Sequence, residues 1–179
     1  VVYEHAADKN NRFGSSRAFE SLPFFAGRAT LEGLYMQASI SAPFVFYIQS
    51  ETSSKPSSPF PQYAYSSLDF NRARARLDMF NARELILASH HAKRSIRSAE
   101  GYALDDTIGD YEIWRRTGGP GRYVTPLEYE PVLLETDNWK AASHLWFTHD
   151  ELLDVHLVFS SMTPKRDRDR FPVRAAELE

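Results

Sequence analysis

The residues whose types and spacing could bind a ligand lie between positions 27 and 35. Gly27-Arg28 is followed by Glu32-Gly33, which places an arginine and a glutamate four residues apart, and Tyr35 follows. A guanidinium and a carboxylate can together hold an anionic group or a hydroxyl group of a ligand. The same two side chains could equally form a local salt bridge that fixes an irregular loop. We take Arg28, Glu32 and Tyr35 as candidate ligand-binding residues and keep the salt bridge as the alternative.

Sequence motifs of established catalytic centres are missing. The chain has no cysteine, no G-x-S-x-G nucleophile motif, no P-loop and no G-x-G-x-x-G. Asp105 and Asp106 stand between two segments that we expect to be strands, Tyr102–Leu104 and Tyr111–Trp114. Aspartate is a turn former, so we predict a turn at these two acids. The catalytic residues, if this chain carries any, are unknown from the sequence.

The histidines do not form a convincing metal site. The most suggestive two, His149 and His156, are seven residues apart with Asp150 and Asp154 between them. On a helix they would share a face, but the alternation over Val155–Phe159 favours a strand. We therefore expect surface or core histidines, no metal and no cofactor.

Composition indicates a folded chain that does not bind nucleic acid. The 179 residues suffice for one domain, 13% of them are aromatic, and no apolar run reaches the 18 residues of a membrane span. Residues 69–98 carry seven bases and three acids, whereas residues 99–162 carry four bases and twelve acids. The basic stretch could contact phosphate or anionic lipid, or it could be a solvated helix face or pair with the acidic half. The net charge of −3 and the lack of recognition motifs disfavour nucleic acid.

The elements around these residues are a mixture of helices and strands. Asp69 predicts the N-cap of a helix with Phe70, Ala73 and Leu77 on its buried face. We expect its arginines, Arg72, Arg74 and Arg76, to project from its other faces. Glu84–Ala88 predicts a buried central strand, Ser89 a cap of a helix to Arg97, and Glu51–Pro61 an exposed loop.

The C-terminal part continues this mixture. Asp137 predicts the cap of a helix with Trp139, Ala142 and Trp146 on one face, and Asp154–Ser160 a last strand. The sequence therefore predicts an α+β fold, a mixed β-sheet with flanking helices in a single domain. We place this domain at residues 1–160 and a charged tail or linker at residues 161–179. Because the chain starts at Val1 without a methionine, we expect it to be a piece of a longer protein.

Several segments in order resemble the extracytoplasmic region of the 6-pyruvoyl-tetrahydropterin-synthase-related integral membrane proteins. These segments are Arg17–Tyr35, Leu77–Leu87, Gly109–Trp114, Arg122–Val124 and Pro131–Leu133. Such proteins look like relatives of the multi-spanning glycosyltransferases that use lipid-linked sugars. Where the family commonly has valine and tyrosine, this chain has Ala82 and Glu84.

The resemblance implies a non-catalytic extracytoplasmic domain at the cell membrane, belonging to a larger glycosyltransferase-like protein of cell-surface glycan or glycolipid assembly. Its partners would be the membrane-spanning part of the same parent chain and a glycan or lipid-linked sugar. The isolated domain would have no activity, although the parent protein could be a glycosyltransferase. Two alternatives stay open: a free-standing carbohydrate-active enzyme, and a module that binds glycan or protein.

Overall fold

The computed structural model describes residues 1–33, 36–119 and 121–171. The chain divides into two compact units, unit 1 at Val1–Tyr123 and unit 2 at Val124–Glu179. This division falls at residue 123, not at residue 160, where we place the domain boundary from the sequence, and the domain assignment stays a prediction. The α+β class, with a mixed sheet and flanking helices, is confirmed.

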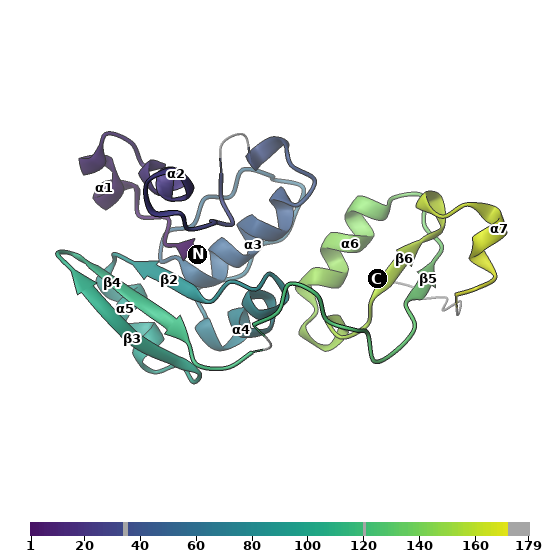
Figure 1. The fold of residues 1–179 in the computed structure, drawn as a ribbon. Coiled ribbons are helices and arrows are strands. Elements are labelled where there is room, and N and C mark those ends of the chain that lie inside the picture. The colour runs from purple at the N-terminus through teal and green to yellow at the C-terminus, as the bar shows by residue number, and fades with distance from the viewer. Residues whose placement is uncertain (34–35, 120, 172–179) are drawn as a thin grey trace. The chain divides into compact units, whose positions relative to one another are not determined.

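The described helices and strands follow one another in a mixed order (Figure 1). The strands are β1 Val2–Tyr3, β2 Glu84–Leu87, β3 Tyr102–Ile108, β4 Tyr111–Arg116, β5 Val132–Leu134 and β6 Leu157–Phe159. The helices are α1 Ala7–Asn10, α2 Leu22–Ala26, α3 Ala42–Thr52, α4 Phe70–Met79, α5 His90–Arg97, α6 Trp139–Thr148 and α7 Lys165–Arg168. Short 3-10 turns lie at Asn11–Phe13, Ala18–Ser21, Met36–Ala38, Asp150–Leu152 and Ser160–Met162.

Unit 1 contains a four-stranded sheet in the order β1-β2-β4-β3. β1 runs parallel to β2, whereas β4 pairs antiparallel with both β2 and β3. β2 is a central strand as predicted, and its Leu85 and Leu87 are buried. Full burial of such side chains stabilises the fold by about 1.5–3 kcal/mol each.

The predicted caps of α4 and α5 are confirmed. The Asp69 carboxylate accepts hydrogen bonds from the amides of Asn71 and Arg72, and the Ser89 hydroxyl accepts one from the Ala92 amide. These bonds satisfy amides that have no partner within the helix. The local sequence thus sets the start of both helices that flank β2.

Two predictions about charged residues of unit 1 are wrong. Glu51 does not open an exposed loop but lies in the last turn of α3, and Arg76 does not project from α4 into solvent. Both side chains are completely buried, and Arg76 Nη1 donates to Glu51 Oε1 at 3.1 Å. The Arg76 guanidinium also lies 4.8 Å from the centre of the Tyr47 ring. This ion pair joins α3 to α4 inside the unit.

The turn predicted at Asp105 and Asp106 is also wrong. Both residues belong to β3, and the register with β4 shifts between Leu104 and Asp106, so that Asp105 is the extra residue of a bulge. Its carboxylate accepts from Arg115 Nη2 on β4 at 2.9 Å. The chain reverses instead at Gly109, whose φ of 57° is left-handed. A cross-strand partner thus keeps a turn-forming residue in the strand.

Unit 2 contains the parallel strands β5 and β6 with α6 between them in sequence. The predicted cap is one residue early, because the side chain of Asn138, not Asp137, accepts from the Ala141 amide. The buried face of α6 also differs from the predicted one: Ser143, His144 and Phe147 are buried, and the tryptophans are half-buried. Trp146 Nε1 donates to the carbonyls of Leu152 and Val155, which accounts for its position at the helix edge.

Candidate functional site

A cavity of about 390 Å³ lies at the start of β2 in unit 1, and we call it the Arg28 cavity. It is lined by Gly27–Leu31, by Phe80–Glu84, and by Val1 and Tyr123. Both lining segments leave a helix through a left-handed residue, Gly27 after α2 and Asn81 after α4. Glycine and asparagine adopt this conformation most readily. The two helix ends therefore bring residues distant in sequence to one cavity.

The charged lining consists of two guanidinium groups and one carboxylate. Arg28 Nη1 lies 3.6 Å from Glu84 Oε1, and Arg115 Nη2 reaches the same oxygen at 3.9 Å from the neighbouring strand. Arg83 has no ion pair among the residues that the structure describes. If Gly121 carried a Cβ, that atom would clash with Arg83 Nη1, so the guanidinium lies directly over the glycine. The cavity thus offers more positive than negative charge.

Glu32 is not part of the Arg28 cavity lining. Its Oε1 accepts from Gln49 Nε2 of α3 at 2.9 Å, whereas Arg28 pairs with Glu84. The local salt bridge between Arg28 and Glu32, our alternative from the sequence, is therefore replaced by two separate contacts. Burial raises the pKa of Glu32, and burial next to the Glu32 charge raises the pKa of Tyr3. Glu32 fastens the loop to α3, and Tyr35 lies outside the described residues.

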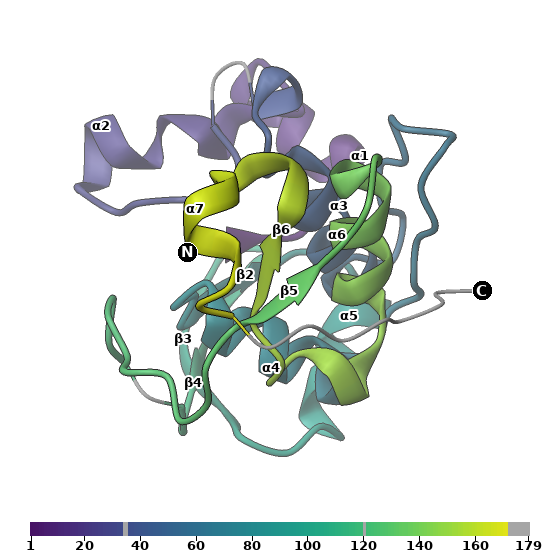
Figure 2. The same ribbon diagram turned by 90° about the vertical axis from the view of Figure 1, so that its right-hand side faces the viewer.

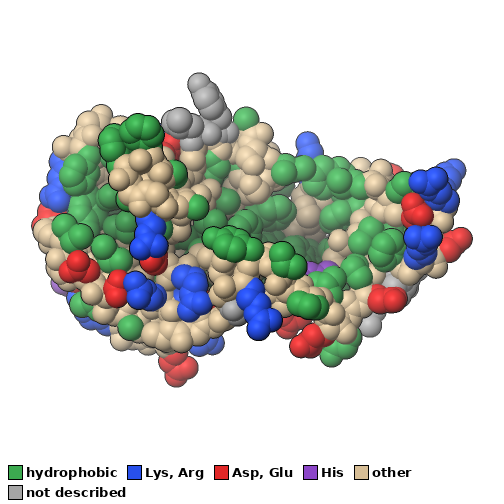
Figure 3. Space-filling view, viewed as in Figure 1, with side chains coloured by type: hydrophobic (Ala, Val, Ile, Leu, Met, Phe, Trp, Pro, Cys, Tyr) green, Lys and Arg blue, Asp and Glu red, His purple; other side chains and the backbone are tan. Residues whose placement is uncertain are grey.

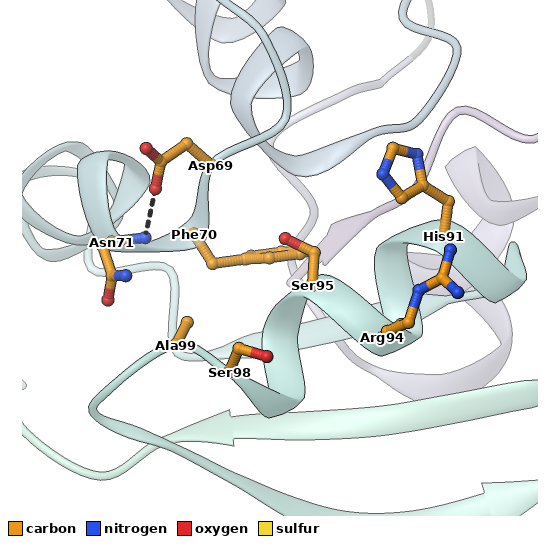
Figure 4. A pocket seen from close by; sticks show the side chains of 8 residues that line it. All are labelled: Asp69, Phe70, Asn71, His91, Arg94, Ser95, Ser98 and Ala99. Atoms are coloured by element: carbon orange, nitrogen blue, oxygen red, sulfur yellow. Dashed lines mark hydrogen bonds between the residues drawn. The ribbon is translucent and has the colours of Figure 1, made fainter.

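A second cavity, of about 360 Å³, lies between the start of α4 and the exposed side of α5 (Figure 4). Asp69 stands on one side and His91 and Arg94 on the other, with Phe70 and Ser95 between them. The Asp69 carboxylate is engaged in capping α4. This cavity combines one cationic side chain with small polar groups, which is a weaker constellation than the paired arginines of the Arg28 cavity.

Part of the basic stretch at residues 69–98 is paired with acids of the following segment. Arg74 pairs with Glu100 and Arg97 with Glu112, whereas Lys93 Nζ donates to the uncharged Asp110 carbonyl at 2.6 Å. Pairing with the acidic half, one of the alternatives from the sequence, thus accounts for Arg74 and Arg97. Arg83 and Arg94 are without an ion pair in the described part of the chain, and each lines one of the two cavities above.

Sequence reasoning missed Arg83 and Glu84 as cavity residues. The sequence did contain a signal, because these two charged residues stand between the end of a helix and a buried strand. Residues at the start of a strand lie at the edge of the sheet, where a cavity can form. It also missed Glu4, whose buried Oε2 accepts from the amides of Ala88 and Ser89. Because backbone amides hold this carboxylate, we assign Glu4 a structural role that joins β1 to the start of α5.

Acidic residues are few in the cavities that the described residues form. Besides the two cavities above, one cavity lies at α2 and one at α6, and each of the four contains one acidic residue: Asp69, Glu20, Glu84 or Glu135. Within the described ranges, no three His, Asp or Glu side chains gather as metal ligands. Among the same residues, the helices fall short of the length and apolarity needed to cross a bilayer.

Comparisons with known proteins give one match. Residues 1–127 match a family described as "Domain of unknown function (DUF8559)", and this range ends close to the boundary of unit 1 at residue 123. No curated protein and no solved structure matches the chain. The match covers well over half of the chain and includes every residue of the Arg28 cavity, so the chain belongs to the DUF8559 family.

Proposed function

We propose that the chain is a non-catalytic extracytoplasmic domain of a multi-spanning, glycosyltransferase-like membrane protein of cell-surface glycan or glycolipid assembly. In this proposal the Arg28 cavity binds the anionic part of a glycan or of a lipid-linked sugar. The observation that carries it is the convergence of Arg28, Arg83 and Glu84 around a single cavity.

The chemistry of the cavity suits a ligand with both an anionic group and hydroxyl groups. Guanidinium groups bind carboxylate and phosphate oxygens in bidentate fashion, and a carboxylate accepts hydrogen bonds from sugar hydroxyls. The exposed ring of Tyr123 at the margin offers an apolar face. A volume of about 390 Å³ lies within the usual range of small-ligand sites, roughly 300–1,000 Å³.

The non-catalytic assignment follows from the carboxylates. Hydrolysis of a glycosidic bond needs two carboxyl groups on opposite sides of the bond, about 5–10 Å apart. Glu84 is the one acidic residue among the described residues of the Arg28 cavity, and two arginines engage it. This favours binding over the alternative of a free-standing carbohydrate-active enzyme.

The membrane assignment is supported by the resemblance of Arg17–Tyr35 and Leu77–Leu87 to the integral membrane family. Both walls of the Arg28 cavity come from these two segments. The proposed partner is the membrane-spanning part of the same parent chain. Sequencing the parent reading frame tests this part: several long apolar segments beside this chain are expected, and a frame without them would overturn it.

Ligand binding is tested by titrating the purified chain with glucuronic acid, inorganic pyrophosphate or glucose. The changes in backbone amide chemical shifts, measured by NMR, report binding. We expect the two anions to shift residues 27–31 and 80–84, and glucose to act far more weakly. The double variant R28Q/R83Q should lose at least tenfold in affinity, whereas the control R94Q, which alters the other cavity, should bind normally.

Equal binding by R28Q/R83Q, or no shift with either anion, would overturn the ligand assignment. Release of glucose from a lipid-linked donor by the chain alone would contradict the non-catalytic role.

A further inference from the structure

The most exposed aromatic pair of unit 1 lies on α2. Phe24 and Phe25 are 85% and 79% exposed, and their rings meet edge to face with centres 4.9 Å apart. α2 stands at the periphery of its unit, away from the sheet (Figure 2), and hydrophobic side chains gather on the surface over it (Figure 3). Two adjacent phenylalanines in water forgo the stabilisation of burial, so their exposure calls for a binding partner.

This pair lies on a short helix that follows an anchored phenylalanine. α2 begins with Pro23 in its first turn and ends at Gly27 in a left-handed conformation. Just before it, the Phe19 ring packs against Tyr3 at 5.5 Å and against Tyr111 at 5.3 Å. Phe19 therefore anchors the segment before α2 to β1 and β4. The short helix α2 follows this segment and carries the two exposed rings.

The more exposed charged side chains near the pair are arginines, and each is paired with a less exposed glutamate. The segment from residue 13 to residue 28 contains Arg17, Glu20 and Arg28. The two arginine side chains are 46% and 61% exposed, whereas the Glu20 side chain is 6% exposed and paired with Arg17. Arg17 lines the same cavity as Phe24 and Phe25, and Arg28 follows the end of α2 by two residues, so an approaching surface would meet guanidinium groups near the two rings.

We propose that α2 docks the domain on a membrane surface that contains anionic lipid headgroups, with Phe24 and Phe25 inserted at the level of the headgroups. Aromatic rings favour this interfacial zone, and arginine side chains can reach the phosphates beside them. Two exposed rings with exposed arginines nearby fit a lipid surface. A stable protein partner needs a broader interface, about 800 Å² per side.

The inference rests on the proposed membrane location and shares Arg28 with the Arg28 cavity. Phe24 and Phe25 do not line that cavity, so variants of these two residues test membrane binding separately from ligand binding. The test is co-sedimentation of the full chain with vesicles of phosphatidylcholine alone and of phosphatidylcholine with phosphatidylglycerol in equal parts. We expect binding to the mixed vesicles, weaker binding to pure phosphatidylcholine, and a decrease with added salt.

The variant F24S/F25S should bind the mixed vesicles at least tenfold more weakly. It should unfold at the same temperature as the native chain and keep its affinity for glucuronic acid, because neither ring lines the Arg28 cavity. The matched control L104S/I108S removes two other exposed apolar side chains, on β3, and should bind vesicles normally.

Undiminished vesicle binding by F24S/F25S, or no binding of the native chain to either vesicle, would overturn the proposal. Equal binding to both kinds of vesicle would overturn the role of anionic headgroups. A native dimer that F24S/F25S converts to a monomer would assign the rings to a second copy of the chain instead.

Discussion

Two arginine–glutamate pairs of unit 1 share the same chemistry and differ in their surroundings. Glu51 and Arg76 are completely buried between α3 and α4, and they approach to 3.1 Å. Arg28 and Glu84 lie at the Arg28 cavity, 3.6 Å apart, with the arginine well exposed. A buried charge needs its partner because water cannot replace it, whereas an exposed charge can exchange its partner for a ligand. Burial thus separates a structural pair from a candidate binding pair.

The largest effect is expected from Arg76→Met. This change leaves the Glu51 carboxylate buried without its closest guanidinium, which costs about 3–5 kcal/mol of unfolding free energy. Urea denaturation of the chain measures it. The double variant E51Q/R76M should recover part of the loss, because it removes the uncompensated charge. A loss below about 1 kcal/mol for R76M would erase the distinction between the two pairs.

An intermediate effect is expected at Asp78, whose two oxygens accept from Nε and Nη2 of the buried Arg116 at 3.2 and 2.7 Å. Asp78→Asn removes the charge and one acceptor, and we expect a loss of about 1.5–3 kcal/mol, as for hydrogen bonds to charged groups. The same denaturation experiment measures it. If D78N lost more unfolding free energy than R76M, the contribution of an ion pair to stability would not follow its burial.

Glu32 tests a half-buried carboxyl group whose hydrogen-bond partner is neutral. Burial raises its pKa above the ordinary value of 4.5 in the folded chain. The stability linked to this shift is present below the unfolded pKa and is lost as the pH rises through the folded pKa. Glu32→Gln lacks this titrating group, so the melting temperature of the variant relative to that of the native chain should rise as the pH increases above the ordinary carboxyl pKa of 4.5. Parallel melting curves of the two proteins against pH would contradict this.

The smallest effect on stability is expected from Arg28→Gln. An exposed ion pair contributes about 0–1 kcal/mol, so the unfolding free energy should change within that range. Affinity for glucuronic acid should nevertheless decrease, because the guanidinium lines the cavity. A large loss of stability in R28Q would show that the Arg28–Glu84 pair has a structural role, as the Glu51–Arg76 pair does.

The correct predictions depend on neighbours in sequence. Asp69 and Ser89 cap their helices through amides two or three residues ahead. The apolar run at Leu85–Leu87 indicated a buried strand because such runs are typical of central strands. These signals are local, so one sequence suffices to read them.

The wrong predictions depend on partners far away in sequence. Asp105 stays in a strand because Arg115 on the neighbouring strand binds it. Arg76 is buried because it pairs with Glu51, which lies 25 residues earlier in the chain. The candidate site shows the same limit. Arg28 was chosen for its closeness to Glu32, but the fold pairs it with Glu84, 56 residues further along.

By itself, the sequence determined the α+β class, the caps of the two helices around β2 and the central place of that strand, because capping and apolar periodicity act over a few residues. Only the tertiary structure decided which charges are buried and which face a cavity. That choice depends on long-range packing, which sets how far each side chain is exposed to water. Exposure in turn determines how much each ion pair contributes to stability.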